Sequence, residues 1–289
     1  MIKKSLAVCC VIMFCFGAVF AQQANEPKLY KIGNVEVWAI ADSVGERDLS
    51  VFEGADEKIL KKYVPSGKAP TAVMTYLIKD GEETVLIDTG FGKGLMEGLE
   101  KLNVKPEDIT IVLITHMHRD HIGGLVKDDK IVFPNAAVKI GKNEYDFWLS
   151  DKSAEEFPSR QENFDMAKQT VSAYGDSVKI FNYDDMVTSN IKALDASGHT
   201  PGQAVFLLES GENKLLFIAD LIHCADLQFP RPDISGRFDI DAEKSAKTRK
   251  QFLEKASKEK LLIAGTHLPF PGAAKVKKAG KGYSYTTEK

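Results

Sequence analysis

The sequence predicts an α/β fold, α+β in stricter usage, in a single domain that follows a short leader. Continuous apolar runs typical of buried strands recur along the chain, helical periodicity lies between and after them, and no repeat or linker interrupts the pattern. A net charge of −3 with 44% apolar and 27% charged residues describes an ordinary globular chain. This balance argues against a disordered protein and against a nucleic-acid binder that depends on a basic field.

The first 21 residues are predicted to be a signal peptide. Lys3 and Lys4 provide the charged start, residues 6–21 are small or apolar, and Ala21 ends a cleavage-site pattern. The competing interpretation is a membrane anchor, but a span needs about 20 apolar residues. This stretch has only 16. We therefore expect an exported protein, periplasmic or secreted, with no stable membrane insertion after cleavage.

The mature chain, residues 22–289, is expected to fold without a disulfide, because only Cys224 of the four cysteines lies outside the leader. Alternating apolar and polar residues predict a half-buried strand over 28–41. Two strand patterns over 73–78 and 83–88, separated by Asp80-Gly81, predict a β-hairpin. The remaining elements expected are a short helix over 94–102, a buried strand over 109–114, partial helix over 155–174 and a longer helix over 241–258.

Polar side chains that can bind metals follow several of the strand candidates. In α/β sheets, chemistry gathers where strands end, and glycines at these ends permit tight backbone turns. The five strand ends in question lead to Asp88, His116, His199, Asp220 and His267. Five loops of this kind predict one convergent site.

The most specific segment is 115–124, in which His116, His118, Asp120 and His121 fall within six residues. Imidazole and carboxylate suit zinc and other borderline divalent ions. In extended backbone His116 and His118 project to the same side, and a following turn can aim Asp120 and His121 at a second ion. A lone histidine is more often a satisfied core or surface residue, but this cluster without a metal would concentrate costly polar groups. The segment therefore predicts a metal site.

The order His-x-His-x-Asp-His, Gly-His-Thr-Pro-Gly, Ala-Asp and Gly-Thr-His resembles the metallo-β-lactamase superfamily of binuclear metallohydrolases over nearly the whole mature chain. The resemblance implies a four-layer αββα sandwich with the metals at one edge of the paired sheets. It also implies a ligand set: His116, His118 and His199 for one ion, Asp120, His121 and His267 for the other, and Asp220 bridging both. Asp88 would orient a ligand histidine, although a turn-forming aspartate explains the sequence equally well.

This ligand set implies hydrolysis with two divalent ions, and zinc is the expected metal. Two ions about 3.5–4 Å apart lower the pKa of a shared water, and the resulting hydroxide attacks carbon or phosphorus. Asp120 is a catalytic candidate that could hold or receive a proton. The zinc β-lactamases carry Cys or Ser in place of Asp220, which disfavours β-lactam hydrolysis. An iron-dependent redox enzyme and a metal used only for folding are the competing classes, and no nucleic-acid partner is expected.

A closer likeness extends over the second half of the chain. Residues 219–229, 266–272 and 280–283 resemble methyl-parathion-hydrolase-type enzymes and their lactonase relatives, including dihydrocoumarin-hydrolase-like members. Quorum-quenching lactonases carry Tyr where this chain has His223. His223 is a candidate to donate a hydrogen bond to the substrate carbonyl or to protonate the leaving alkoxide. The alternative is that His223 only packs against its neighbours. The likeness favours small-molecule lactones or aryl and carboxylic esters, with phosphotriesters or acyl-homoserine lactones as alternatives.

Trp148, Phe164 and Phe238 match positions that line the substrate pocket in that group. An aromatic wall fits an apolar or aryl substrate, although single aromatics of this kind are more often core residues. Cys224 is expected to be a buried thiol and not a nucleophile. Relatives of this kind often form dimers, so a homodimer is a candidate assembly.

Overall fold

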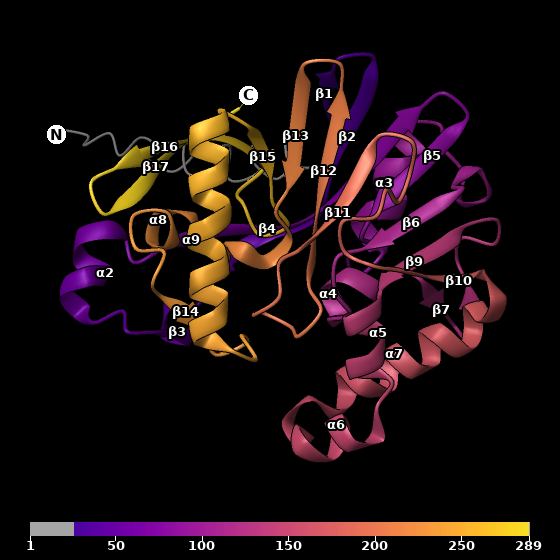
Figure 1. Ribbon diagram of the computed structural model, residues 1–289, viewed down its shortest axis with the longest axis horizontal. Helices are drawn as coiled ribbons and strands as arrows, with labels where there is room; N and C mark the ends of the chain where they lie inside the picture. The colour runs from indigo at the N-terminus through magenta and orange to yellow at the C-terminus, as the bar shows by residue number, and fades with distance from the viewer. Residues whose placement is uncertain (1–25, 289) are drawn as a thin grey trace, which may run out of the picture.

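A computed structural model describes residues 26–288. Two β-sheets face each other at the centre of the fold (Figure 1). The predicted signal peptide, residues 1–21, lies outside the described residues. Within 26–288, none of the helices combines the length and apolar character that crossing a bilayer requires.

The first sheet has seven strands in the order β1-β2-β4-β5-β6-β9-β10. These strands are β1 (Lys28–Ile32), β2 (Val35–Arg47), β4 (Ala69–Asp80), β5 (Glu83–Ile87), β6 (Ile111–Ile114), β9 (Ala137–Gly141) and β10 (Val178–Phe181). Within this sheet, β1, β2, β4 and β5 pair antiparallel with one another, whereas β5, β6, β9 and β10 pair in parallel. The parallel pairing brings the carboxyl ends of β5 and β6 to one edge, where Asp88 and segment 115–124 follow.

The second sheet has six strands in the order β11-β12-β13-β15-β16-β17. These strands are β11 (Ile191–Asp195), β12 (Ala204–Ser210), β13 (Asn213–Phe217), β15 (Leu262–Ala264), β16 (Ala273–Ala279) and β17 (Gly282–Thr287). Its one parallel pair is β13 with β15. Asp220 and His267 therefore follow neighbouring strand ends, as Asp88 and His116 do in the first sheet.

Helices cover the outer face of each sheet. On the first sheet α3 (Lys93–Lys101), α5 (Lys142–Trp148) and α7 (Gln161–Tyr174) bury their apolar sides, and α9 (Ala242–Glu259) does so on the second. Side chains of both sheets form the central core, where the rings of Tyr76 and Phe217 meet at 5.2 Å. This is the four-layer αββα sandwich that the resemblance implied. The short elements are α2 (Glu57–Tyr63), α4 (Arg119–Ile122), α6 (Asp151–Glu156), α8 (Ala225–Gln228) and the ribbons β3 (Phe52–Glu53) with β14 (Ser235–Gly236) and β7 (Val126–Lys127) with β8 (Lys130–Ile131).

The prediction of one strand over 28–41 was wrong, because this segment is a hairpin of β1 and β2. Gly33 turns the chain with a φ of +59°, which a residue without Cβ adopts at little cost. The buried positions change parity between Ile32 and Val35, and this shift marks the turn. The predicted β4–β5 hairpin, the helix over 94–102 and the long helix after Asp241 are confirmed.

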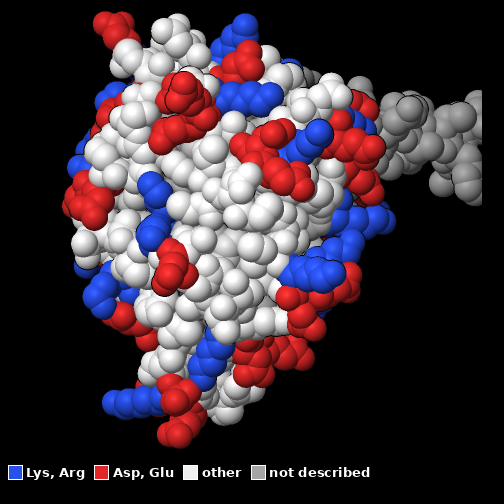
Figure 2. Space-filling view, turned by 90° about the vertical axis from the view of Figure 1, so that its right-hand side faces the viewer, with Lys and Arg blue, Asp and Glu red and all other residues white. Residues whose placement is uncertain are grey.

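Charges of both signs are interspersed on the face shown in Figure 2, around an area of uncharged residues. This face therefore presents no continuous basic surface. The expected absence of a nucleic-acid partner stays a prediction.

Candidate metal centre

Loops from both sheets converge at one edge of the sandwich. The residues that they bring together are Asp88, His116, His118, Asp120, His121, His199, Asp220, His223 and His267. A backbone hydrogen bond joins the two halves there, because the amide of Ala204 donates to the carbonyl of Thr115 at 2.8 Å. The sequence-predicted ligands therefore occupy one place in the fold.

The first cluster consists of His116, His118, His199 and Asp220. Nδ1 of His118 lies 3.1 Å from Nε2 of His116 and 2.9 Å from Nε2 of His199. Oδ2 of Asp220 lies 3.7 and 3.4 Å from these two Nε2 atoms. Four ligands placed tetrahedrally around zinc, at bond lengths of about 2.0–2.1 Å, are about 3.3 Å apart. These four atoms are therefore spaced as the ligands of one ion.

The second cluster consists of Asp120, His121 and His267, with Asp220 between the two clusters. Nε2 of His267 lies 3.3 Å from Oδ2 of Asp120 and 3.1 Å from Oδ2 of Asp220. Nε2 of His121 lies 3.2 Å from Oδ1 of Asp220. Asp220 thus reaches both clusters. The Asp120 side chain is 25% exposed and that of Asp220 only 3%, so solvent reaches the centre beside Asp120.

The donor atoms of these clusters fit divalent cations. Nε2 of His121 and Oδ1 of Asp220 are buried, lie 3.2 Å apart and make no hydrogen bond. A desolvated polar atom without a partner costs free energy, and a cation bound between these two atoms would satisfy both. The set of imidazole nitrogens and carboxylate oxygens is one that zinc prefers.

Acceptors behind three of the histidines fix the orientation of their rings. The pairs are Nδ1 of His121 with Oδ2 of Asp88 at 2.7 Å, Nδ1 of His199 with Oδ1 of Asp239 at 2.8 Å, and Nδ1 of His267 with the carbonyl of Ala72 at 2.9 Å. Each contact leaves Nε2 directed at the cluster. Asp88 therefore contacts a proposed ligand, in the place that the sequence suggested for it.

The carboxylates give the centre a preference for positive charge. Burial opposes charge on His121, but Asp220, Asp88 and Asp120 together raise its pKa well above the usual value. Burial and the neighbouring imidazoles lower the pKa of His116 well below it. The carboxylates that favour a proton on His121 favour a metal cation at the same place.

His223 lies between the rings of Phe238 and His267, with centroid distances of 4.1 and 5.0 Å. Its Nε2 is 3.0 Å from Oδ2 of Asp220, and its buried Nδ1 has no hydrogen-bond partner. Burial lowers the pKa of His223 to about 3 in spite of Asp220, so the ring is neutral at neutral pH. The fold brings His223 to the ligands, and its part in the chemistry stays a prediction.

The three predicted pocket aromatics occupy different environments. Trp148 and Phe164 are fully buried and pack against each other at 4.7 Å, and Trp148 lies edge-on to His118 at 5.5 Å. Phe238 is only half-buried and covers His223. Of these three side chains, only Phe238 is accessible to solvent beside the proposed ligands. Substrate contact by all three stays a prediction.

Residues 69–267 match the metallo-beta-lactamase superfamily. The chain belongs to this superfamily. A solved structure of AidC, described as a dizinc quorum-quenching lactonase in complex with a homoserine product, is 30% identical. It superposes with a TM-score of 0.84 over 91% of this chain and 98% of AidC.

Two curated relatives indicate the range of activities near this sequence. An atrochrysone carboxyl ACP thioesterase of Passalora fulva is 30% identical over 151 residues, which cover 51% of this chain but only 37% of that protein. An N-acyl homoserine lactonase of Bacillus cereus is 22% identical over 224 residues, 68% of this chain and 80% of that protein. The family match shows the superfamily, and these two relatives show which activities occur near this sequence.

Sequence reasoning missed three buried charged residues of this protein: Glu144, Asp239 and Arg249. Arg249 carries a detectable signal, because it interrupts the apolar side of α9 between Ala246 and Phe252. Glu144 and Asp239 carry none, since Thr200 and His199, the partners that connect them to the metal centre, are far away in the sequence. Asp239 orients His199, and Oδ2 of Asp239 lies 3.5 Å from Arg249.

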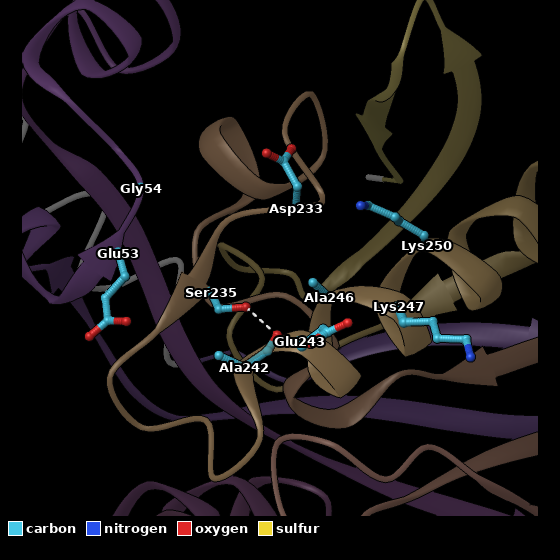
Figure 3. Close-up of a pocket in the computed structure, with 9 residues that line it drawn as sticks. All are labelled: Glu53, Gly54, Asp233, Ser235, Ala242, Glu243, Ala246, Lys247 and Lys250. Carbon is cyan, nitrogen blue, oxygen red and sulfur yellow. Dashed lines mark hydrogen bonds between the residues drawn. The ribbon is translucent and has the colours of Figure 1, made fainter.

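Two further features lie outside the ligand clusters. Cys224 is a buried free thiol whose pKa is raised to about 11 by burial, as expected of a thiol that is not a nucleophile. A cavity of about 690 Å³ lies beside α9 and the β3–β14 ribbon. Figure 3 shows the residues that line it, among them Glu53, Asp233 and Lys250. None of the proposed metal ligands lines this cavity.

Proposed function

We propose that this protein is a binuclear zinc hydrolase of lactones or of aryl and other carboxylic esters. The observation that carries the proposal is the position of Asp220, whose carboxylate lies within 3.7 Å of nitrogen atoms in both clusters. One carboxylate shared by two ligand sets is the arrangement that holds a pair of ions over one substrate. The description of AidC as a dizinc lactonase, at 30% identity over nearly the full chain, supports the same conclusion.

When bound, two such ions would activate a water molecule and polarise the substrate carbonyl. Asp120, the ligand that solvent reaches, is placed to hold a proton and pass it to the leaving oxygen. When Nε2 of the neutral His223 ring carries the proton and donates it to Asp220, Nδ1 of the same ring can only accept a hydrogen bond. His223 can therefore donate to a substrate carbonyl from Nδ1 only in the other tautomer, in which Nδ1 carries the proton. Phe238 supplies an apolar surface beside these groups.

Hydrolysis by zinc-reconstituted protein tests the proposal. The panel contains dihydrocoumarin, an acyl-homoserine lactone, a nitrophenyl ester, an acyl thioester, a phosphotriester and a β-lactam. We expect turnover of a lactone or an aryl ester that His116→Ala abolishes and that Glu162→Ala, on the exposed side of α7, leaves intact. Protein that holds zinc and hydrolyses neither class would overturn the proposal.

A thioester is the second candidate substrate, because a relative that matches half of this chain at 30% identity is described as a thioesterase. A thioester has the same electrophilic carbonyl but a leaving group that needs no proton. Comparing kcat/KM for an ester and a thioester with the same acyl group decides between the two. Faster thioester hydrolysis, unaffected by changes at His223, would favour the second candidate.

We further propose export through the signal peptide of residues 1–21. The protein recovered from outside the cytoplasm of an expression host should begin at Gln22. A full-length chain retained with the cells would contradict this. The homodimer stays a prediction that sedimentation of the purified protein tests.

A further inference from the structure

The buried carboxylate of Glu144 receives four hydrogen bonds. Glu144 is fully buried and lies in the first turn of α5. Its Oε1 accepts the amide N–H of Met117 at 2.8 Å and the indole N–H of Trp148 at 2.6 Å. Its Oε2 accepts the hydroxyl of Thr200 at 2.6 Å and the amide N–H of Gly202 at 3.1 Å. Both oxygens are therefore saturated.

The donors to Glu144 stand next to proposed metal ligands on two loops. Met117 lies between His116 and His118, in the loop after β6 of the first sheet. Thr200 directly follows His199, in the loop between β11 and β12 of the second sheet. One carboxylate thus holds together the two loops whose histidines form the first cluster.

His118 lacks the ring support that three of the other histidine ligands have. His121, His199 and His267 each have an acceptor behind the ring, but Nε2 of His118 is buried with no hydrogen-bond partner. Its ring is instead packed edge-on against Trp148 at 5.5 Å. The indole N–H of Trp148 is in turn fixed by Glu144, so the carboxylate controls both the backbone and the packing surface of His118.

The Gly-His-Thr-Pro-Gly motif makes the contact possible. A Cβ on Gly202 would lie 2.0 Å from the backbone nitrogen of Glu144 and 2.4 Å from its Cα. Real Cβ atoms do not approach backbone this closely, so only glycine lets this loop reach α5. The motif therefore has two functions. It supplies His199, and its residues Thr200 and Gly202 donate hydrogen bonds to Glu144.

We propose that Glu144, acting through Trp148 and the backbone of the two loops, is a positioning residue that sets the zinc affinity of the first cluster. This inference rests on the proposed function. A role limited to folding would lower stability and leave the affinity of the folded protein for zinc unchanged. Positioning predicts a separate loss of affinity, because the ligand atoms of His118 and His199 lie only 2.9 Å apart across the two loops.

Zinc affinity measured by competition with a chromogenic chelator tests the proposal, with urea unfolding of the apoprotein measured in parallel. All variants carry His267→Ala, which removes a ligand of the second cluster and weakens its hold on zinc, so the tighter site in the titration is the first cluster. The main variant is Glu144→Gln, whose amide nitrogen meets hydrogen-bond donors. The matched control is Tyr174→Phe, which removes a buried hydroxyl bonded to Phe133 and Leu125, away from both loops.

We expect Glu144→Gln to weaken zinc binding by about 10–100-fold, the usual effect of losing an outer partner of a metal ligand. Tyr174→Phe should lower stability and bind zinc as its parent does. If Glu144→Gln does not fold, Thr200→Val removes one donor and keeps the carboxylate, with an expected loss of about fivefold. Unchanged zinc affinity in the folded variant overturns the inference. Wild-type protein that binds no zinc overturns the proposed function as well, which distinguishes the two failures.

Discussion

Replacement of Arg249 by Met should cost more stability than any surface substitution on the same helix. The guanidinium group is fully buried in α9. Its hydrogen-bond acceptors are the carbonyls of Leu221, Pro232 and Ile234 and the hydroxyl of Ser245. Arg249 also lies 3.5 Å from Asp239, the carboxylate that orients His199.

The expected magnitude follows from what Arg249→Met leaves behind. Met approximates the volume of the Arg stem, so the loss is mainly polar. The carbonyls of Leu221 and Pro232 lose the donor that Arg249 supplies, whereas that of Ile234 keeps Gln228, and the buried charge on Asp239 loses its cation. Breaking a buried ion pair on one side costs about 3–5 kcal/mol. At about 2–4 °C per kcal/mol for a chain of this size, the melting temperature should fall by about 6–20 °C.

Urea unfolding of the apoprotein measures this loss, and Lys250→Met is the matched control. Lys250 is the next residue on α9, carries the same charge and is exposed, so its replacement should change stability by about 0.5 kcal/mol or less. A difference between the two variants below about 1 kcal/mol would mean that Arg249 does not neutralise Asp239 in a desolvated site.

Burial opposes the ionisation of Asp239, but His199 and Arg249 hold its pKa well below the usual range. Its stabilisation is therefore present above about pH 4 and lost as the pH falls. In the Asp239→Asn apoprotein, the free energy of unfolding should therefore fall less steeply as the pH is lowered below about 4. An unchanged pH dependence would argue against this. Cys224 should resist alkylation at pH 8 until the protein unfolds, because its pKa is about 11; rapid labelling of native protein would contradict this. Zinc at 100 times its Kd should add about 2.7 kcal/mol to the free energy of unfolding, so removal of zinc by a chelator should lower the melting temperature. Equal melting temperatures with and without the chelator would mean that zinc is not bound. Phe238→Ala should raise KM for an aryl ester more than for an acetate of a small alcohol, and equal effects would place its ring away from the substrate.

The ligand clusters could be predicted because their residues stand in short motifs directly after strands. His116, His118, Asp120 and His121 share one loop, and local spacing alone indicates a metal site. The assignment of ligands to two ions came from the resemblance. The fold then shows which atoms approach one another.

The supporting residues could not be predicted because their partners are distant in the sequence. Glu144 meets Thr200 across 56 residues, and Asp239 meets His199 across 40. The resemblance implies that Trp148 lines the substrate pocket, which stays a prediction, and it gives no sign that the indole N–H contacts Glu144 inside the fold. Whether a buried polar side chain has a partner depends on tertiary contacts, which periodicity does not report.

A crystal of the zinc-loaded protein, measured at the zinc absorption edge, tests directly whether the centre is binuclear. We predict two anomalous peaks about 3.5–4 Å apart. One peak should contact His116, His118 and His199, the other Asp120, His121 and His267, and both should contact Asp220. A single peak, or two peaks that do not share Asp220, would contradict a binuclear centre.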